Sequence, residues 1–509
     1  MTTQYPFRAL SLCRAPLIAA AAVICLLNGF SLYRLLTAPA PRNPWEAIEI
    51  VEAWRSLKGM PVYELGHDGH ATHMYGALVP WLQGEIFRWI GPNNISGRAL
   101  SLGSALALVT VITLCMKNER SPWYIMITWA AILGVNHRSG HYFAENRPDM
   151  PALLFATLAI AFFWCGQHRS RAYWLLGTAC LVTGFFLKQT VAIFAVVPLL
   201  VLLLGKRRPM RDEVLFALLP LAAIAATIVT LKTAYPAVYH YMVTVPGGYA
   251  INWPRFIKFF WEVLLDSPLF VFLLGEWIIF DKNSLHEDTR IPWLIAVLAV
   301  SVPFSSLAHA KAGGWPNSML PALLAMMAFC SLRLPGLLAH LEKRALPLRS
   351  RLAYATFLAF LLLMTTFPHI TVANGPVVSA SPWDRDYETV VSVARTLPGK
   401  VICPEDPSIP LHAKRYAGLN LFSEKDARPF RGNWPKAMPA GVLAELCTAD
   451  FVVDVTDYWG ENLDPDLLEK SGFVLDREFS LDAEGYAIWR RRDSGRNDSH
   501  DQTALLETR

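Results

Sequence analysis

The chain has 509 residues, of which 53% are hydrophobic and only 17% are charged, and its mean hydropathy is +0.32. A composition this apolar excludes an ordinary soluble globular protein and predicts an all-α polytopic membrane protein. The formal net charge of +5 arises mainly from Lys and Arg between apolar segments, so it gives little support to a nucleic-acid partner.

Apolar runs near the length that crosses a bilayer, about 17 to 25 residues, recur from Pro16 to Pro368. We count about eleven of them, several being short. The first is interpreted as an uncleaved anchor and not as a signal peptide, because a cut after Ala-Pro-Ala at residues 38–40 would be followed by proline. The expected spans are Pro16–Leu36, Ala99–Met116, Trp123–Val135, Met150–Cys165, Tyr173–Leu187, Thr190–Leu204, Val214–Leu231, Phe259–Phe280, Ile291–Ser306, Ser318–Leu332 and Leu352–Pro368.

The basic residues of the short loops predict the orientation, because Lys and Arg are retained on the cytoplasmic side of a membrane. A cytoplasmic N-terminus places the basic segments 117–120, 169–171 and 206–211 on that side. The extracytoplasmic side then holds the large first outer loop 37–98, the segments 136–149, 188–189, 232–258 and 309–317, and everything after about residue 369.

Three regions are expected: a membrane domain over 1–370, a small soluble extracytoplasmic α/β domain over 380–493, and a disordered polar tail over 494–509. Alternating helix and strand patterns indicate the α/β domain. Its expected elements are helices at Asp384–Arg395, Ala440–Cys447 and Pro465–Ser471, and strands at Lys400–Cys403, Asp450–Val455, Phe473–Phe479 and Tyr486–Arg490.

Part of the first outer loop has the pattern of a helix that lies on a membrane surface. Residues 76–90, GALVPWLQGEIFRWI, carry aromatic and aliphatic side chains on a helical period, with Trp and Arg among them. Amphipathic segments of this kind lie in the plane of the interface. The loop therefore predicts a site at the level of the lipid headgroups.

Acidic residues follow the first span directly, in NPWEAIEIVEAWRSLKGMPVY. Glu46, Glu49 and Glu52 recur every three residues, and on a helix Glu46 and Glu49 share a face. Such a pattern fits a catalytic carboxylate near the membrane. It equally fits a solvated charged face.

The next stretch, HDGHATHMYGALVPW, contains several candidate metal ligands. His67, Asp68, His70 and His73 lie in a glycine-containing loop. Their spacing matches no helical pair or zinc-finger pattern, so we expect hydrogen-bonding roles. A divalent metal site is the alternative that stays open, and no cofactor is predicted.

The second outer loop ends in ENRPDMPALLF, which leads without a break into an apolar span. Pro148 fits the first turn of that helix, and Glu145 and Asp149 would lie near its positive end. Charges at the lip of a span are costly if they move inward, so Glu145, Arg147 and Asp149 are candidate functional groups. The alternative is a helix start with favourable acids, balanced by Arg147.

Two further outer segments carry basic residues. Lys188 and Gln189 form a tight turn between two expected spans, where an ammonium group would attract a lipid phosphate or would simply snorkel to the interface. Lys311 precedes Gly313 and Gly314, and these glycines would either let the backbone approach a ligand or merely turn the chain.

Taken in order, these motifs resemble the GT-C superfamily of membrane glycosyltransferases. The resemblance is to protein O-mannosyltransferases, lipid A aminoarabinose transferases and bacterial proteins with an RgtA/B/C/D-like domain. It covers about residues 15 to 330 and depends on NPWEAIE, on GMPVY at 59–63, on THMYGALVPWLQGEIFRWIG, on ENRPDMPALLF and on LKQT. Two positions depart from the family pattern: Trp45-Glu46 offers one carboxylate in place of an Asp-Glu pair, and Met-Tyr follows His73 in place of two prolines.

The resemblance implies a sugar donor carried on polyprenyl phosphate and an acceptor hydroxyl on a glycan, lipid or protein. It also implies a bacterial inner membrane, with the C-terminal domain in the periplasm. Because the leaving group is already a stable phosphate, one carboxylate must remove the acceptor proton and cations must hold the phosphate charge.

Within this resemblance Glu46 is the preferred general base, with Glu49 still open. Asp149 or Glu145 would be the second carboxylate, which orients a cation or the acceptor. The groups expected to contact donor phosphate or sugar are Arg147, Lys188, Gln189, Arg138, Lys311 and His73.

A transporter or flippase of a lipid-linked or small solute is the alternative function. Transporters place ionisable sites near the midplane and often show paired halves. Asp266 and Glu276, in or beside an expected span, favour this alternative, whereas the charge clusters at the outer lip and the absence of an internal sequence repeat favour the transferase.

Overall fold

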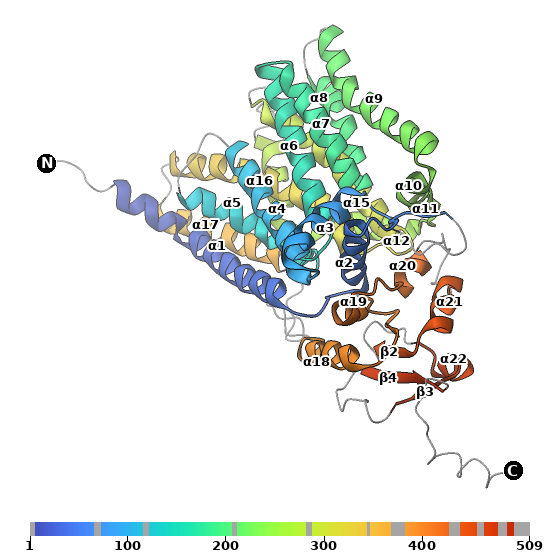
Figure 1. Ribbon diagram of the computed structural model, residues 1–509. Helices are drawn as coiled ribbons and strands as arrows, with labels where there is room; N and C mark the ends of the chain where they lie inside the picture. The colour runs from blue at the N-terminus through green and yellow to red at the C-terminus, as the bar shows by residue number, and fades with distance from the viewer. Residues whose placement is uncertain are drawn as a thin grey trace.

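The computed structural model describes residues 6–65, 73–115, 122–205, 211–280, 288–343, 347–367, 382–426, 438–455, 463–476 and 486–492. A bundle of helices up to residue 367 forms the larger part, and a small α/β unit packs against one end of it (Figure 1). The predicted disordered tail 494–509 lies outside the described residues, as do His67, Asp68 and His70.

The bundle contains α-helices of very different lengths, the 3₁₀ helices η1 and η3, and the π-helix η2. Their bounds are α1 (Pro6–Thr37), α2 (Pro44–Leu57), α3 (Leu78–Ile90), α4 (Asn94–Cys115), α5 (Pro122–Arg138), α6 (Asp149–His168), α7 (Ala172–Leu187), η1 (Gln189–Val196), α8 (Val197–Leu204), α9 (Arg211–Ala234), α10 (Pro236–Tyr239), η2 (His240–Thr244), α11 (Val245–Gly248), α12 (Trp253–Leu265), α13 (Pro268–Phe280), α15 (Arg290–Ala310), η3 (Pro316–Met319), α16 (Leu320–Lys343) and α17 (Leu348–Thr366).

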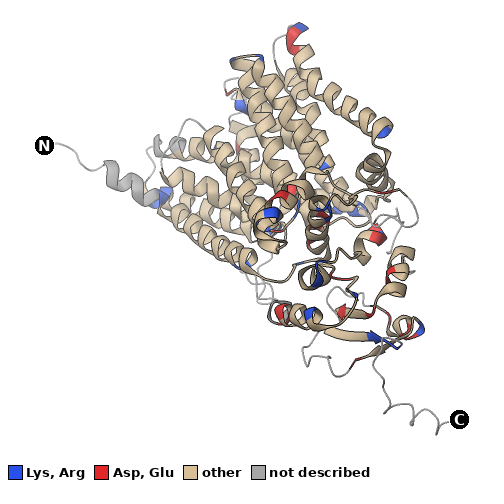
Figure 2. Ribbon diagram, in the orientation of Figure 1, with Lys and Arg blue, Asp and Glu red and all other residues tan. Residues whose placement is uncertain are grey.

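Within the described ranges, seven helices are long and apolar enough to cross a membrane, or eight if the bent pair α12 and α13 is one span. The chain is therefore a multi-pass membrane protein, but the expected count of about eleven spans is not confirmed. The two segments from Ala172 to Leu187 and from Gln189 to Leu204 fall short, because each holds only 16 residues. Charged residues are sparse along the bundle helices and gather around α2, α3 and the C-terminal elements (Figure 2).

The expected span Phe259–Phe280 is divided into two helices that meet at an angle of 78°. Pro268 begins the second helix, and a proline lacks the N–H that would continue the first. Helix α12 exposes Trp253, Ile257 and Trp261 at intervals of four residues, which is one face of the helix. This face has the character of a helix that lies on a membrane surface.

Helix α3 confirms the helix predicted within 76–90. It exposes Trp81 and Trp89 on its outer side, and its inner side packs closely on α2. At Gly84 a Cβ atom would lie 2.7 Å from the carbonyl oxygen of Ala53, so only glycine permits this approach. Helices α2 and α3 are thus held together as one layer above the bundle.

The C-terminal unit is a four-stranded sheet in the order β1-β2-β4-β3 with helices around it. Strand β2 pairs in parallel with β1 and antiparallel with β4, which also pairs antiparallel with β3. The predicted elements are all present, and α19 and α20 are additional. The bounds are α18 (Pro382–Thr396), β1 (Val401–Ile402), α19 (Ser408–Lys414), α20 (Leu421–Asp426), α21 (Ala440–Thr448), β2 (Phe451–Val455), α22 (Pro465–Lys470), β3 (Phe473–Leu475) and β4 (Tyr486–Arg491).

The C-terminal unit is attached to the first outer loop. Leu411 of α19 packs in a buried apolar cluster with Ile50 and Phe87 of α2 and α3. Asn420 donates a hydrogen bond of 3.3 Å to the carbonyl of Pro44, at the first turn of α2. Helix α2 therefore lies between the bundle and the C-terminal unit (Figure 1).

Candidate active site

The start of α2 fixes the first acidic motif. Asn43 caps the helix, because its side-chain oxygen accepts the Glu46 N–H at 2.9 Å, and Pro44 occupies the first turn, where no N–H is needed. The Asn43 side chain also donates to Glu145 Oε2 at 2.8 Å. One capping residue thus joins the first outer loop to the second.

Glu46 is buried completely and accepts four hydrogen bonds. Arg98 donates to both carboxylate oxygens, from Nε and Nη2, each at 2.8 Å. The backbone N–H groups of Asn146 and Arg42 complete the set at 2.8 and 2.6 Å. Residues from 37–98 and from 136–149 therefore converge, as the sequence predicted.

These contacts bear on the expected role of Glu46 as general base. Burial alone would raise the pKa of Glu46, but the Arg98 guanidinium and the hydrogen bonds hold it below its ordinary value. Four donors occupy its oxygens, and Glu46 does not line the cavity described below. The geometry does not favour Glu46 as the base and fits a residue that positions the two loops.

Glu145 lies beside Glu46 and, like Glu46, does not line the cavity described below. Its burial, with the nearby charge of Glu46, raises its pKa to about 8. At neutral pH this carboxyl group is therefore mostly protonated, which suits a structural group better than a base.

A cavity of about 1010 Å³ lies beyond these two residues, between the outer ends of the helices. Five of the ten predicted site residues line it, together with Asp426 of the C-terminal unit. They are Arg147, Asp149, Lys188, Gln189 and Lys311.

Asp149 is the predicted carboxylate that reaches this cavity. Its Oδ1 accepts hydrogen bonds from Lys188 Nζ at 2.6 Å and from Asn317 Nδ2 at 3.2 Å. Its Oδ2 is buried and has no hydrogen-bond partner among the described residues. Asp149 also begins α6, where the helix dipole favours a negative charge.

Arg147 presents unused hydrogen-bond donors to the same cavity. Its Nη2 donates to the hydroxyl of Tyr75 at 2.8 Å, and its guanidinium lies over the rings of Trp45, Tyr75 and Tyr142 at 5.5 to 5.9 Å. Its Nε and Nη1 are buried without a hydrogen-bond partner in the part of the chain that the structure describes. A buried guanidinium with two open donors is suited to a phosphate or carboxylate ligand.

The remaining predicted contacts differ in position. Gln189 donates to the carbonyl of Met74 at 3.1 Å, and Lys311 donates to that of Pro246 at 3.0 Å, both at the cavity wall. Arg138 does not reach the cavity. It donates to the hydroxyl of Ser267 at 2.7 Å, at the bend between α12 and α13.

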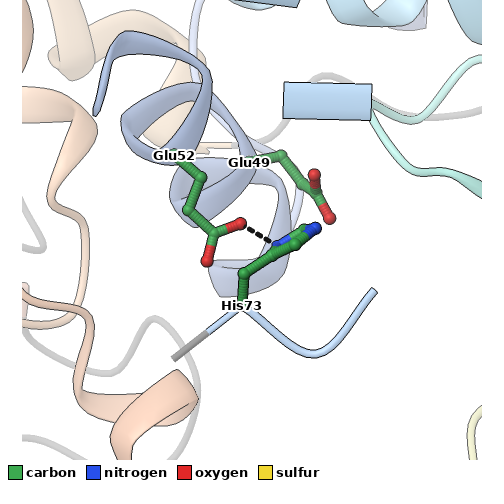
Figure 3. Close-up of side chains that lie close together, drawn as sticks. All are labelled: Glu49, Glu52 and His73. Carbon is green, nitrogen blue, oxygen red and sulfur yellow. Dashed lines mark ion pairs between the residues drawn. The ribbon is translucent and has the colours of Figure 1, made fainter. Parts of the chain in front are cut away.

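Glu49 and His73 are brought together, but outside the cavity. They form a buried cluster with Glu52, in which His73 Nδ1 contacts a Glu52 carboxylate oxygen (Figure 3). The three side chains come from α2 and from the segment just before α3. His73 therefore connects its segment to the acidic face of α2. The sequence did not predict this contact.

Sequence reasoning missed three residues that shape the site. Arg98 had one signal, because it is a basic residue at the outer end of a span, where positive charge is unusual. Tyr75 is an ordinary aromatic in a loop. Asp426 belongs to the C-terminal unit, and its carboxylate accepts the Trp45 Nε1–H at 2.7 Å while its carbonyl accepts from Tyr249.

A second cavity, of about 860 Å³, adjoins the first. Almost all of its lining side chains are apolar, and they come from α4, α6, η1, α15 and α16. Leu153 and Pro321 line both cavities. A polar cavity at the outer end of the bundle thus adjoins an apolar cavity between the spans.

No protein-family model and no curated protein matches this sequence. Solved structures do match it. ArnT from Cupriavidus metallidurans, bound to undecaprenyl phosphate, is 13% identical over 94% of this chain and 98% of its own chain, with a TM-score of 0.54. The apo state of that ArnT is 12% identical over 93% of this chain and 96% of its own, also with a TM-score of 0.54.

An archaeal structure gives a similar result. The oligosaccharyltransferase AglB from Archaeoglobus fulgidus, in complex with an inhibitory peptide and a dolichol-phosphate, is 12% identical over 97% of this chain and 76% of its own, with a TM-score of 0.50. ArnT and AglB are GT-C glycosyltransferases. The fold predicted from the sequence motifs is therefore confirmed, and this chain has the GT-C fold.

Proposed function

We propose that this chain is an integral-membrane glycosyltransferase. It moves a sugar from a polyprenyl-phosphate donor to an acceptor hydroxyl on the extracytoplasmic face of a bacterial inner membrane. The observation that carries this proposal is that two cavities of different character adjoin: Arg147 and Lys188 line the polar one, and the apolar one lies between membrane spans. The polar cavity matches the charged headgroup of a lipid, and the apolar cavity matches its hydrocarbon tail.

The apolar cavity supplies a place for the isoprenoid tail. It reaches from Leu153 near the outer end of α6 to Trp164 near the other end, about 16 Å along the helix axis. A tail in this position leaves its phosphate beside Leu153 and Pro321, where the polar cavity begins. The undecaprenyl phosphate of the ArnT structure and the dolichol-phosphate of the AglB structure support a ligand of this class.

The cations of the polar cavity would bind the donor phosphate. Arg147 has Nε and Nη1 available, and each can donate a charge-assisted hydrogen bond to a phosphate oxygen from its own edge of the guanidinium. Lys188, which contacts Asp149 Oδ1 at 2.6 Å, adds positive charge to the same cavity. Both cations would stabilise the negative charge that develops on the phosphate as it leaves, because they are buried and already in position.

Asp149 is our candidate for the general base. Its Oδ2 is open, whereas Lys188 and Asn317 hold its Oδ1 and fix the carboxylate. The acceptor hydroxyl would attack the anomeric carbon and give its proton to Oδ2. The bond from the anomeric carbon to the phosphate oxygen then breaks, and polyprenyl phosphate leaves as an anion that needs no general acid.

The acceptor would approach from the side of the C-terminal unit. Asp426 at the end of α20 lies at the cavity wall, in contact with Trp45 and Tyr249. The acceptor class that we propose is a cell-envelope glycan or lipid.

The experiment uses purified protein in liposomes, with a panel of hexose and pentose polyprenyl phosphates and envelope glycolipid extracts as acceptors. Release of polyprenyl phosphate and labelling of the acceptor are measured together. Asp149→Asn should lower the rate by about 10²- to 10⁴-fold, the usual contribution of a general base. Asp212→Asn is the control, because Asp212 lies in an exposed pair with Arg171 at the start of α9.

Full turnover by Asp149→Asn would remove Asp149 as the base, and the absence of transfer with every donor and acceptor would count against the transferase itself. The transporter alternative has less support, since Glu276 pairs with Arg333 at 3.3 Å and lines neither cavity. Solute flux into the same liposomes without any glycosyl transfer would reverse that preference.

A further inference from the structure

We propose that Glu49, Glu52 and His73 bind one divalent transition-metal ion. Glu49 and Glu52 lie three residues apart on α2, and His73 lies just before α3. One ligand atom from each residue lies within 4.8 Å of the others, and all three residues are at most 4% exposed. The site is separate from the proposed catalytic residues and does not depend on glycosyl transfer.

The hydrogen bond of His73 fixes its tautomer. Nε2 lies 3.3 Å from the carbonyl oxygen of Gly76, which can only accept, so Nε2 must carry a proton. In a neutral imidazole, Nδ1 then presents its lone pair to the Glu52 carboxylate. Two acceptors in contact require a cation between them, which is either a second proton or a metal ion. Metal-binding histidines commonly donate their other N–H to a backbone carbonyl in this way.

The surroundings of Glu49 favour a metal ion over a second proton on His73. It is 1% exposed, and neither of its oxygens has a hydrogen-bond partner among the described residues. Its carboxylate lies beside the His73 ring (Figure 3). A proton on Nδ1 satisfies Glu52 but leaves Glu49 without a bonded partner, whereas a metal ion would take an oxygen from each carboxylate.

The charge balance points the same way. Two carboxylates and a neutral imidazole sum to a charge of about −2, which one divalent ion neutralises. Arg147 acts electrostatically on Glu49, and Arg55 acts on Glu52, but neither replaces the missing bonds to Glu49.

The ligand set indicates the kind of ion. Imidazole nitrogen favours zinc and its neighbours, and carboxylate oxygens favour harder ions such as manganese, so one nitrogen with two oxygens suits Zn²⁺ or Mn²⁺. Around a tetrahedral zinc the ligand atoms would be about 3.3 Å apart. Metal binding would therefore require the ligand atoms to draw closer than the 4.8 Å within which they now lie, with water as a further ligand.

A metal here would hold part of the cavity wall. Tyr75 follows His73 by two residues, lines the polar cavity and accepts the hydrogen bond from Arg147. Gly76 N–H donates to the Leu187 carbonyl at 3.2 Å, so the same segment also contacts the turn that carries Lys188. The ion would tie this segment to α2 and act as a positioning site.

The test measures metal content directly. Full-length protein in detergent is treated with EDTA to remove bound metal and is then dialysed against Zn²⁺ or Mn²⁺ at roughly 10 µM, which would fill a site of moderate affinity. The number of metal ions per chain is then measured by mass spectrometry. Wild-type protein should bind about one ion, and Glu49→Gln and His73→Ala should lose it. His73→Cys should regain Zn²⁺, because a thiolate is also a zinc ligand.

Two matched variants control for adventitious binding. Glu145→Gln alters another buried carboxyl group, and Glu85→Gln alters an exposed one on α3, and both should keep the ion. The melting temperature of wild-type protein should rise by several degrees on adding the ion after EDTA, because binding to the folded state stabilises it. No bound ion and no such rise in wild-type protein would overturn the proposal even if a variant failed to fold. Binding that survives Glu49→Gln and His73→Ala would identify an adventitious ion only.

Discussion

Arg98 and Glu46 form a fully buried pair in which the guanidinium holds both carboxylate oxygens, each at 2.8 Å. Nη2 of Arg98 also donates to the carbonyl of Ala40 at 2.7 Å, and Asn146 adds its N–H to Glu46. The pair therefore fixes the end of the first span, the start of α2 and the second outer loop at one point.

Substitution of Arg98 should lower the stability of the folded protein. Arg98→Met leaves Glu46 charged and without its main partner in a buried site, at an expected cost of about 3 to 5 kcal/mol. Substituting methionine at both positions should recover much of that loss. The measurement is the melting temperature in detergent, with Arg88→Ala, in an exposed pair with Glu85, as a control that should change little. An unchanged melting temperature for Arg98→Met would refute this description of the pair.

A methyl group at Gly97 should disturb the second outer loop. A Cβ atom there would lie 1.8 Å from Asn146 Oδ1, so Asn146 must move, and with it the N–H that contacts Glu46. Gly97→Ala should lower the melting temperature and the transfer rate together. Gly103→Ala on the same helix meets nothing within 4 Å and should stabilise slightly through its higher helix propensity. Equal effects of the two substitutions would contradict this packing.

Arg147→Lys should weaken use of the donor more than use of the acceptor. Lysine keeps the charge but lacks the fixed, planar set of guanidinium donors, so we expect kcat/KM for the polyprenyl-phosphate sugar to fall by about 10²-fold. Kinetics in which each substrate is varied in turn provide the measurement. Arg171→Lys, in the exposed pair with Asp212, should leave both values unchanged. A larger effect on the acceptor would move Arg147 to the acceptor side of the cavity.

Glu145 should make stability depend on pH. Its burial and the charge of Glu46 raise its pKa to about 8 from an ordinary value of 4.5. The folded state therefore holds a proton that the unfolded chain releases, so this contribution is complete below about pH 4.5 and is lost as pH rises towards 8. The loss can reach about 1.4 kcal/mol per pH unit. Glu145→Gln should show a smaller fall in melting temperature between pH 6 and 8.5 than wild-type protein, whereas Glu85→Gln should not differ from it.

The sequence predicted the class of fold and the loops that form the site because both depend on local patterns. Apolar length identified the long spans, and helix-start chemistry placed Asp149 near the positive end of α6, although Pro148, expected in the first turn, is the N-cap residue. The C-terminal strands and helices followed from their periodicity. Short segments such as Ala172–Leu187 are not confirmed as spans, because their helices are shorter than the length that crosses a bilayer without distortion.

The distribution of roles within the site could not be predicted in the same way. The sequence alone does not separate the roles of the Glu46 and Asp149 carboxylates. Only the tertiary position of Arg98 shows that the oxygens of Glu46 are occupied by hydrogen-bond donors. Asp426 reaches the cavity from a domain far along the chain, with no motif around it. The meeting of His73 with Glu49 and Glu52 likewise depends on how the loop returns to α2.

Asn43 has a consequence for how this region opens and closes. Its side chain accepts from Glu46 N–H at the start of α2 and donates to Glu145 in another loop. Fraying of that first turn would release both contacts at once. Amide exchange at residues 46–47 and 145–147 should therefore proceed as one cooperative unit, even though about a hundred residues of chain separate the two segments.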